Sequence, residues 1–393
     1  MKRLLLGGAC LIAAALLPAA AGAQDTMKIG VINVYSGQFA DTGAQIDNGI
    51  KLYMKQHGDT VAGEKIEVIR KDVGGINPPV AKRLAQELVT RDKVDILAGF
   101  ALTPNALAAA DVSAEAKKLM VVMNAATAII TTKSPYIVRT SFTVPQLNQT
   151  LGTWAEKNGG VKKAYTMVSD FGPGIDAEGA FQKGFKEAGG DVVGSVRMAV
   201  ANPDFSSYVQ RAKDLNPEAI FIMIPGGAMP GAFGKALAER GIDPQKTKVM
   251  GQMEITDEHA LKSMGDVALG IITSGHYDYN LKSKMNDEFV KAYNAEFKRN
   301  PDFFSVGGYD GMHLIYAALE KTKGVADGDS LVAAAMGMKW ESPRGPMSID
   351  PETRDVVQTV YIRKVEKVGG NLVNVVIGKV DDVKDPFKAA MKK

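Results

Sequence analysis

Short apolar runs alternate with stretches of helical spacing along most of the chain. In the first third, four apolar runs predict buried strands, at residues 27–34, 64–72, 94–100 and 118–125. Patterns with apolar residues three and four apart predict helices between them, at residues 43–58, at 78–92 and after Thr103. Regular alternation of strand and helix predicts an α/β fold in which helices cover a parallel sheet.

The same alternation then begins again. Five further strands are predicted, at residues 162–170, 190–198, 218–225, 246–253 and 269–277. Helical patterns lie between or after them, at residues 174–188, 204–215, 228–241, 282–298 and 305–321. The tail, 356–380, alternates like a pair of strands with a turn at Gly369-Gly370-Asn371. Two such blocks predict two similar Rossmann-like lobes, each built on a parallel sheet.

No Ser-, Pro- or Gly-rich linker separates the two blocks, so we expect the chain to pass directly between lobes. Crossings are expected at three places, near Arg139–Phe142, Thr273–Tyr277 and Arg344–Ser348. The expected first lobe comprises residues 24–140 and 277–344, and the second comprises 141–276 and 345–393. Three crossings between two lobes predict a hinge.

The N-terminal residues have the pattern of a cleavable targeting segment. Lys2 and Arg3 precede an apolar run, and Ala21-Gly22-Ala23 supplies the small residues of a cleavage site, so residues 1–23 are expected to be a secretory signal peptide. The only cysteine, Cys10, lies inside that segment. The expected mature chain therefore excludes disulfides, thiol catalysis and thiolate metal sites, and we expect an exported protein.

The net charge of the chain and the length of its apolar stretches limit which partners it can have. Removing Lys2 and Arg3 lowers the formal net charge from +3 to +1. A balanced charge disfavours nucleic acid or an anionic membrane as the main partner. No second apolar stretch approaches the roughly 18 residues needed to span a bilayer.

Polar residues gather where the predicted strands of the first lobe end. In open α/β sheets, ligands bind beyond the carboxyl ends of the strands. The first strand leads to Tyr35, Ser36, Phe39 and Thr42, and the third and fourth strands lead to Thr103 and Thr127. We expect Thr103 to cap a helix that Pro104 opens, because these residue types favour those positions. Hydroxyls and helix N-termini suit a carboxylate.

The second lobe offers the opposite charge at its strand ends. Asp170, Asp176 and Glu254 follow predicted strands, and Phe171 stands beside the first of them. A carboxylate there suits an ammonium group, and an aromatic ring covers an apolar group. With a carboxylate site in the first lobe and an ammonium site in the second, the sequence favours a small zwitterion held between closing lobes. Two plainer interpretations stay open, namely Thr103 as a helix cap alone and Glu254 as a solvated loop acid.

Signals for catalysis, metal binding and cofactors are missing from the sequence. It contains no G-x-S-x-G elbow, no H-E-x-x-H and no Walker A loop. The four histidines lack the spacing of metal ligands, although His276 stands near an expected crossing. Asp170-Phe171-Gly172 matches a kinase tripeptide that nothing else in the chain supports. We therefore expect no cofactor and no enzyme activity.

Several segments, in order, resemble one known family. They include "KIGVINVYSGQFADTGAQIDNGIKLY", "VDILAGFALTPNALA", "LMVVMNAATA", "YIVRTSF", "YTMVSDFGPGIDAEGAFQKGFKEAGGDVVG", "DFSSYVQRAKDLNPEAIFI" and "FSVGGYDGMHLIYAAL". Together they resemble the periplasmic leucine/isoleucine/valine-binding type of ABC-transporter substrate-binding protein. The resemblance implies a type I periplasmic-binding fold with three crossings. It also implies a periplasmic receptor, expected to be a monomer, that closes on a small ligand and docks on permease subunits.

The resemblance also implies roles for individual residues. In amino-acid binders of this family, the positions of Thr103, Ala125 and Thr127 hold the ligand carboxylate, and an acid near Glu254 holds the ammonium group. This chain departs from the pattern at Phe171, where a tyrosine is common, and in the small residues that precede Met229. A branched-chain or related amino acid is the expected ligand, and an aromatic acid of the benzoate or hydroxycinnamate kind, or a small amide, is the alternative.

The predicted ligand site combines these sets. Its members are Tyr35, Ser36, Phe39, Thr42, Thr103, Ala125, Thr127, Asp170, Phe171, Met229, Glu254 and Tyr277. Two other classes stay open as alternatives. The first is an exported enzyme that uses Asp170 or Glu254 as acid or base, for which no nucleophile or second placed carboxylate is visible. The second is a sensory domain that passes its ligand state to a separate partner.

Overall fold

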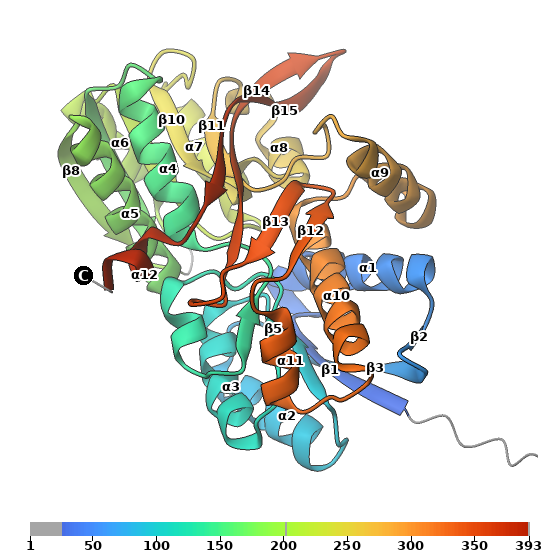
Figure 1. Ribbon diagram of the computed structural model, residues 1–393. Coiled ribbons are helices and arrows are strands. Elements are labelled where there is room, and N and C mark those ends of the chain that lie inside the picture. The colour runs from blue at the N-terminus through green and yellow to red at the C-terminus, as the bar shows by residue number, and fades with distance from the viewer. Residues whose placement is uncertain (1–25, 201–202, 392–393) are drawn as a thin grey trace, which may run out of the picture.

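The computed structural model describes residues 26–200 and 203–391, and it consists of two α/β lobes joined by crossing segments (Figure 1). The expected signal peptide, residues 1–23, lies outside the described residues. Within the described ranges, no helix has the length and apolar character needed to cross a membrane. The predicted two-lobed α/β architecture is confirmed.

The first lobe contains a six-stranded sheet in the order β2-β3-β1-β4-β5-β6. Its strands are β1 (Thr26–Asn33), β2 (Thr60–Val61), β3 (Glu64–Asp72), β4 (Ile96–Gly99), β5 (Met120–Val122) and β6 (Ile137–Arg139). Every pairing is parallel except that of β2 with β3. Central strands buried on both faces are continuous apolar runs, which is why the sequence pattern located them.

Helices from two distant parts of the chain cover this sheet. The early ones are η1 (Gly37–Phe39), α1 (Ala40–His57), α2 (Pro78–Thr90), α3 (Thr103–Ala116) and η2 (Ala128–Thr132), and the late ones are α9 (Lys284–Phe297), α10 (Phe303–Thr322) and α11 (Gly328–Ala335). Helices α1 and α10 touch through glycines. A Cβ on Gly49 would lie 2.0 Å from the Ser305 carbonyl oxygen, and one on Gly308 would lie 2.1 Å from that of Ile46.

The second lobe contains a larger, mixed sheet in the order β12-β13-β14-β11-β10-β9-β7-β8, with β15 paired to β14. Its strands are β7 (Lys163–Ser169), β8 (Asp191–Met198), β9 (Ala219–Met223), β10 (Lys248–Gln252), β11 (Ile272–Gly275), β12 (Lys339–Ser342), β13 (Gly345–Ile349), β14 (Val356–Val368) and β15 (Asn371–Val383). The five strands β7 to β11 are parallel, as predicted. The last four strands add to them in antiparallel pairings, so the sheet is mixed, and β14 and β15 form the hairpin predicted at Gly369-Gly370-Asn371.

Helices of the second lobe lie on both faces of its parallel strands (Figure 1). They are α4 (Val144–Lys157), α5 (Gly172–Ala188), α6 (Phe205–Leu215), α7 (Met229–Glu239), η3 (Met253–Thr256), α8 (Glu258–Met264), η4 (Gly265–Ala268) and α12 (Pro386–Met391). Helix α4 begins right after the first crossing, and no helix was predicted there. The lobe boundaries stay predictions, and the pairing adds that β12, expected with the first lobe, extends the second sheet.

Each crossing is held by a buried arginine. Arg139 ends β6 and pairs with Asp355, Arg363 on β14 pairs with Asp278 just after β11, and Arg344 before β13 pairs with Asp310 of α10. In all three pairs the side chains are at most 4% exposed. Charges removed from water in this way need several partners.

Arg344 ties two crossings together. Its Nη1 donates to the carbonyl oxygen of Ser141 at 2.7 Å and to Gln358 Oε1 at 3.0 Å, and its Nη2 lies 2.8 Å from Asp310 Oδ2. Nη2 also donates to the Thr140 carbonyl oxygen. The third crossing therefore holds the first by its backbone.

We expect Arg344→Met to lower the free energy of unfolding by about 3–5 kcal/mol, because it leaves Asp310 as an unpaired buried charge. Arg83→Met is the matched control, since Arg83 forms an exposed i,i+4 pair with Glu87, and such pairs contribute about 0.3–0.5 kcal/mol. Urea unfolding of the two variants measures both values, and equal losses would contradict the assignment.

Candidate functional site

A cleft between the lobes gathers residues from both sheets and from the crossings. It encloses about 600 Å³ between atoms, including space that opens to solvent. The first lobe and α10 contribute Phe39, Thr42, Ile76, Ala101, Leu102, Thr103, Pro104, Asn124, Ala125, Ala126 and Phe304. The first crossing and the second lobe contribute Phe142, Val144, Phe171, Pro173, Met223, Pro225, Gly226, Gln252 and Glu254. Most of these residues follow the carboxyl ends of strands, where open α/β sheets bind ligands.

The start of α3 forms one end of the cleft. The predicted role of Thr103 as helix cap is wrong, because the cap position falls on Leu102, which makes no side-chain cap bond, and Thr103 is already the first helical residue. Pro104 occupies the next position and lacks an N–H in any case. The hydroxyl of Thr103 is thus not used for capping. The first amides of the helix lack helical acceptors and lie at its positive end.

Thr127 lies behind Thr103. Its Oγ1 donates to Thr103 Oγ1 at 3.1 Å, and both side chains are buried. Because Thr103 accepts this bond, its own O–H proton is left to point elsewhere. Ala125 and Ala126 of the neighbouring loop also line the cleft. The Ala125 N–H donates to the Phe100 carbonyl oxygen at 2.9 Å, so the Ala126 N–H, the Thr103 hydroxyl and the first amides of α3 form the cradle of donors at this end of the cleft.

Phenyl rings form the walls of the cleft. Phe39 comes from η1, Phe142 from the first crossing, Phe171 from the start of α5 and Phe304 from α10. His276 does not line the cleft, since it is fully buried behind Phe142, with ring centroids 5.1 Å apart. Burial, together with the charges of nearby arginines, lowers its pKa, so the ring is neutral.

A single carboxyl group lies at the second-lobe end of the cleft. Both oxygens of Glu254 accept from Gln252 Nε2 at 2.8 Å, and Asn148 Nδ2 holds Gln252 Oε1 at 2.7 Å. Burial raises the pKa of Glu254 to about 7, although the Gln252 hydrogen bonds act in the opposite direction. At neutral pH this carboxyl is therefore present in both ionisation states. No described residue lining the cleft is a lysine or an arginine.

The lobes touch each other around this cleft. The Ala128 N–H of η2 donates to Asp176 Oδ2 of α5 at 2.9 Å. A Cβ on Gly227 would lie 3.2 Å from the carbonyl oxygen of Gln38, and one on Gly172 would lie 3.5 Å from Thr127 Oγ1. These approaches describe a closed arrangement of the lobes.

The residues predicted for the site fall into three groups. Six line the cleft: Phe39, Thr42, Thr103, Ala125, Phe171 and Glu254. Thr127 stands one layer behind. Five lie outside the lining: Tyr35, Ser36, Asp170, Met229 and Tyr277.

Those five have other surroundings. The backbone N–H of Tyr35 and the side chain of Ser36 bond to Asp72, and Asp170 is exposed. Met229 packs partly buried against the core of the second lobe. The hydroxyl of Tyr277, a residue of the second crossing, donates to Asn286 Oδ1 of α9 at 2.9 Å.

Sequence reasoning missed several lining residues. Gln252 ends β10, so the same strand-end rule could have found it. Phe142 and Phe304 come from a crossing and from the start of a helix, which only the closed tertiary arrangement brings to the cleft. Among the described residues, no group of three or more His, Cys, Asp or Glu side chains could hold a metal ion.

Comparison with known proteins shows which family has this architecture. Residues 26–370 match the family described as periplasmic binding protein. A Leu/Ile/Val-binding protein homolog 6 of Brucella abortus is 43% identical over 354 residues, which cover 89% of this chain and 90% of that protein.

Solved structures of solute-binding proteins have the same fold. A solute-binding protein of an ABC transporter from Rhodopseudomonas palustris BisB5, in complex with 3,4-dihydroxybenzoic acid, is 55% identical with a TM-score of 0.89, covering 93% of this chain and 100% of that one. Its counterpart from R. palustris HaA2, in complex with p-hydroxybenzoic acid, is 42% identical with the same TM-score and coverage. The leucine-binding protein LivK of Thermotoga maritima shares the fold at 21% identity, with a TM-score of 0.81 over 90% of this chain and 99% of that one. The chain therefore belongs to the periplasmic binding protein family, as a solute-binding protein of the leucine/isoleucine/valine-binding type that serves ABC transporters.

Proposed function

We propose that this receptor binds a hydroxylated benzoic acid, of the 3,4-dihydroxybenzoate class, for uptake from the periplasm through an ABC permease. The proposal rests on how polar and apolar groups are distributed along the cleft. A cradle of amide and hydroxyl donors lies at one end, phenyl rings form the walls, and one buried carboxyl group lies at the other end. The relative that is 55% identical, solved in complex with 3,4-dihydroxybenzoic acid, supports the same class.

The proposed pose follows from matching groups. The ligand carboxylate faces the start of α3 and Thr103, because N–H groups and the positive helix end favour an anion. The ring lies among the phenyl walls, where its burial contributes the hydrophobic part of the affinity. A ring hydroxyl then reaches Glu254 and Gln252. A site built to bond a hydroxyl discriminates strongly against analogues that lack it.

An aliphatic amino acid is the second candidate. The curated relatives that are 43% identical carry the name Leu/Ile/Val-binding, and Glu254 faces the donor cradle as an ammonium partner would. The raised pKa of Glu254 weighs against it, because an ammonium ligand needs that carboxyl ionised. We further propose that the chain acts as a monomeric receptor without turnover, so purified protein should leave its ligand chemically unchanged.

A thermal-shift panel tests the ligand class. We expect 3,4-dihydroxybenzoate and 4-hydroxybenzoate to raise the melting temperature clearly, since a ligand at a hundred times its Kd adds about 2.7 kcal/mol. Benzoate, benzamide, leucine, isoleucine and valine complete the panel. A shift with the aliphatic amino acids and none with the hydroxybenzoates would replace the proposal with the second candidate.

We expect Thr103→Val to weaken 4-hydroxybenzoate binding about tenfold or more, because it removes a hydrogen bond to a charged group. Thr127→Val should weaken it less, since Thr127 acts through Thr103. Thr90→Val is the matched control, because the Thr90 hydroxyl bonds only to the Gln86 carbonyl oxygen on the surface of α2. Titration calorimetry gives the three Kd values, and unchanged affinity in both cleft variants would reject the cradle.

Glu254→Gln tests the hydroxyl end of the cleft. With a pKa of about 7, Glu254 ionises as the pH rises from 6 to 8. The ionised form accepts a phenol proton more strongly than the neutral form does. The preference of the wild type for 4-hydroxybenzoate over benzoate should therefore grow with pH over this interval, by up to about tenfold.

In Glu254→Gln the preference should be small and independent of pH. Glu258→Gln, which alters a surface acid paired with Lys262, should behave like the wild type. Equal losses for both ligands in Glu254→Gln would mean that Glu254 does not contact the hydroxyl.

A further inference from the structure

We propose that two residues are positioning residues for the loop that binds the ligand carboxylate. They are Arg139, at the end of β6, and Lys388, in the C-terminal helix α12. This inference rests on the carboxylate end of the proposed function. Neither residue lines the cleft. Arg139 bonds to backbone carbonyl oxygens of residues 124–132, and Lys388 bonds to the Thr131 side chain and to Asp355. The C-terminus would thereby be a remote part of the ligand site.

Arg139 holds this loop by its carbonyl oxygens. Its Nη1 donates to the carbonyl oxygens of Ala125 at 3.1 Å and Thr127 at 2.8 Å. Its Nε and Nη2 both donate to Asp355 Oδ1, at 2.9 and 2.7 Å. The Arg139 side chain is 0% exposed, so no water competes for these bonds.

The direction of the carbonyl groups decides where the amides point. In a trans peptide, the C=O of one residue and the N–H of the next point in opposite directions. With the carbonyls of Ala125 and Thr127 turned to Arg139, the N–H groups of Ala126 and Ala128 point away from it. The Ala128 N–H indeed reaches Asp176 of the other lobe. Ala126 lines the cleft, and its N–H has no acceptor among the described residues.

Arg354 holds the later part of the same loop. Its Nη2 donates to the carbonyl oxygens of Thr131 at 2.6 Å and Ser134 at 3.3 Å, and its Nε donates to that of Ile137 at 3.1 Å. The Arg139 N–H in turn donates to the Arg354 carbonyl oxygen at 3.0 Å. Two guanidinium groups thus bond to carbonyl oxygens along the segment from Ala125 to Ile137, and neither lines the cleft.

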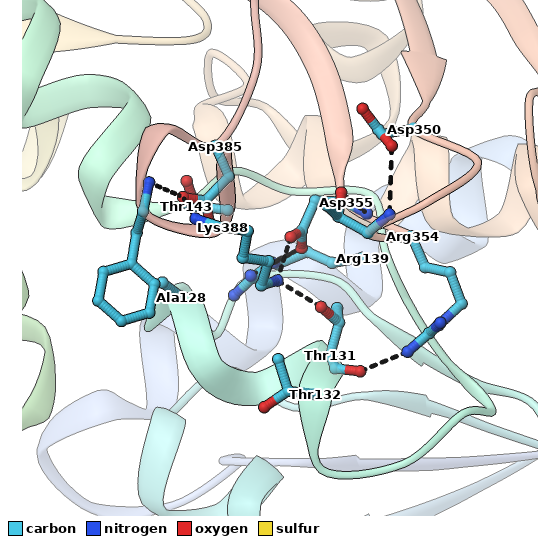
Figure 2. Close-up of polar contacts among 12 residues, drawn as sticks. Ala128, Thr131, Thr132, Arg139, Thr143, Asp350, Arg354, Asp355, Asp385 and Lys388 are labelled. Carbon is cyan, nitrogen blue, oxygen red and sulfur yellow. Dashed lines mark hydrogen bonds and ion pairs between the residues drawn. The ribbon is translucent and has the colours of Figure 1, made fainter. Parts of the chain in front are cut away.

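Lys388 completes this arrangement from the end of the chain. Figure 2 shows its side chain reaching Thr131 and Asp355, and the ammonium group donates to Thr131 Oγ1 and Asp355 Oδ2. One oxygen of Asp355 therefore binds Lys388 while the other binds Arg139. Lys388 is only 5% exposed, and lysines are almost never buried without such pairing. Asp385, also buried, adds a second negative charge near both cations.

Loss of the Lys388 ammonium removes one of the two cations on Asp355 and the α12 contact of Thr131. The phenyl walls and Glu254 are not touched. The loop then holds its amides less precisely, so recognition of the carboxylate weakens while recognition of the ring does not. This separation distinguishes positioning from general stability.

The experiment compares Lys388→Met with wild type for two probes, 3,4-dihydroxybenzoate and its neutral amide, 3,4-dihydroxybenzamide. We expect Lys388→Met to lose about tenfold in affinity for the acid and less than threefold for the amide. Lys388→Arg should restore most of the loss. Lys384→Met is the control, because that lysine is 66% exposed and pairs at 3.0 Å with Asp350, which is not a partner of Lys388. Equal losses for acid and amide, or unchanged affinity for both, would overturn the proposal.

Hydrogen exchange of the ligand-free protein provides a readout that does not depend on the ligand class. Lys388→Met should speed exchange in residues 124–132 and leave α6 and α7 unchanged, whereas Lys384→Met should change neither. Unchanged exchange in the loop would overturn the positioning role even if the hydroxybenzoates prove not to be ligands. Should leucine be the ligand, leucine and leucinamide replace the acid and amide probes.

Discussion

Buried guanidinium groups bonded to backbone carbonyl oxygens are the constraint on which this two-lobed arrangement depends. The three crossings carry the backbone between two cores, where its polar groups would be costly without partners. Arg139, Arg344 and Arg363 each supply several donors in a fixed planar fork, and each is neutralised by an aspartate. A lysine could not replace that geometry, because its single ammonium group lacks the fork.

One of these arginines also links a crossing to the cleft between the lobes. Arg139 ends a strand of the first sheet, yet its partner Asp355 precedes β14 of the second sheet. The loop it holds contributes Ala125 and Ala126 to the cleft. One guanidinium group thus bonds both to the loop that lines the cleft and to a residue beside the second sheet. The site and the hinge share one network.

The sequence predicts the alternation of strands and helices in both lobes better than it predicts strand pairing and the segments near the crossings. Apolar runs located most of the parallel strands of both sheets within a few residues, because buried strands are continuously apolar. The antiparallel addition of β12 to β15 was missed in part, since apolar alternation does not reveal the direction of pairing. Helix α4 was missed although Thr143 and Gln146 form a capping box, a signal that was available.

The candidate site shows the same difference between what the sequence predicts and what it does not. Phe39, Thr42, Thr103, Ala125, Phe171 and Glu254 could be proposed because strand ends converge on one edge of each sheet, and the family resemblance pointed to three of them. Phe142 and Phe304 could not, because their place in the cleft depends on how the lobes close. The displacement of Thr127 behind Thr103 depends on a single hydrogen bond that no spacing reveals.

The bond between the Ala128 amide and Asp176 has a consequence for how the receptor meets its cargo. It joins the lobes without any contribution from a solute, so the protein itself lowers the free energy of the shut form. A solute that prefers the shut form then has less work to do, and its apparent affinity approaches the intrinsic one. The same bias reduces the difference between loaded and empty molecules, so a permease that recognises only the shut outline would also be visited by receptors that carry nothing.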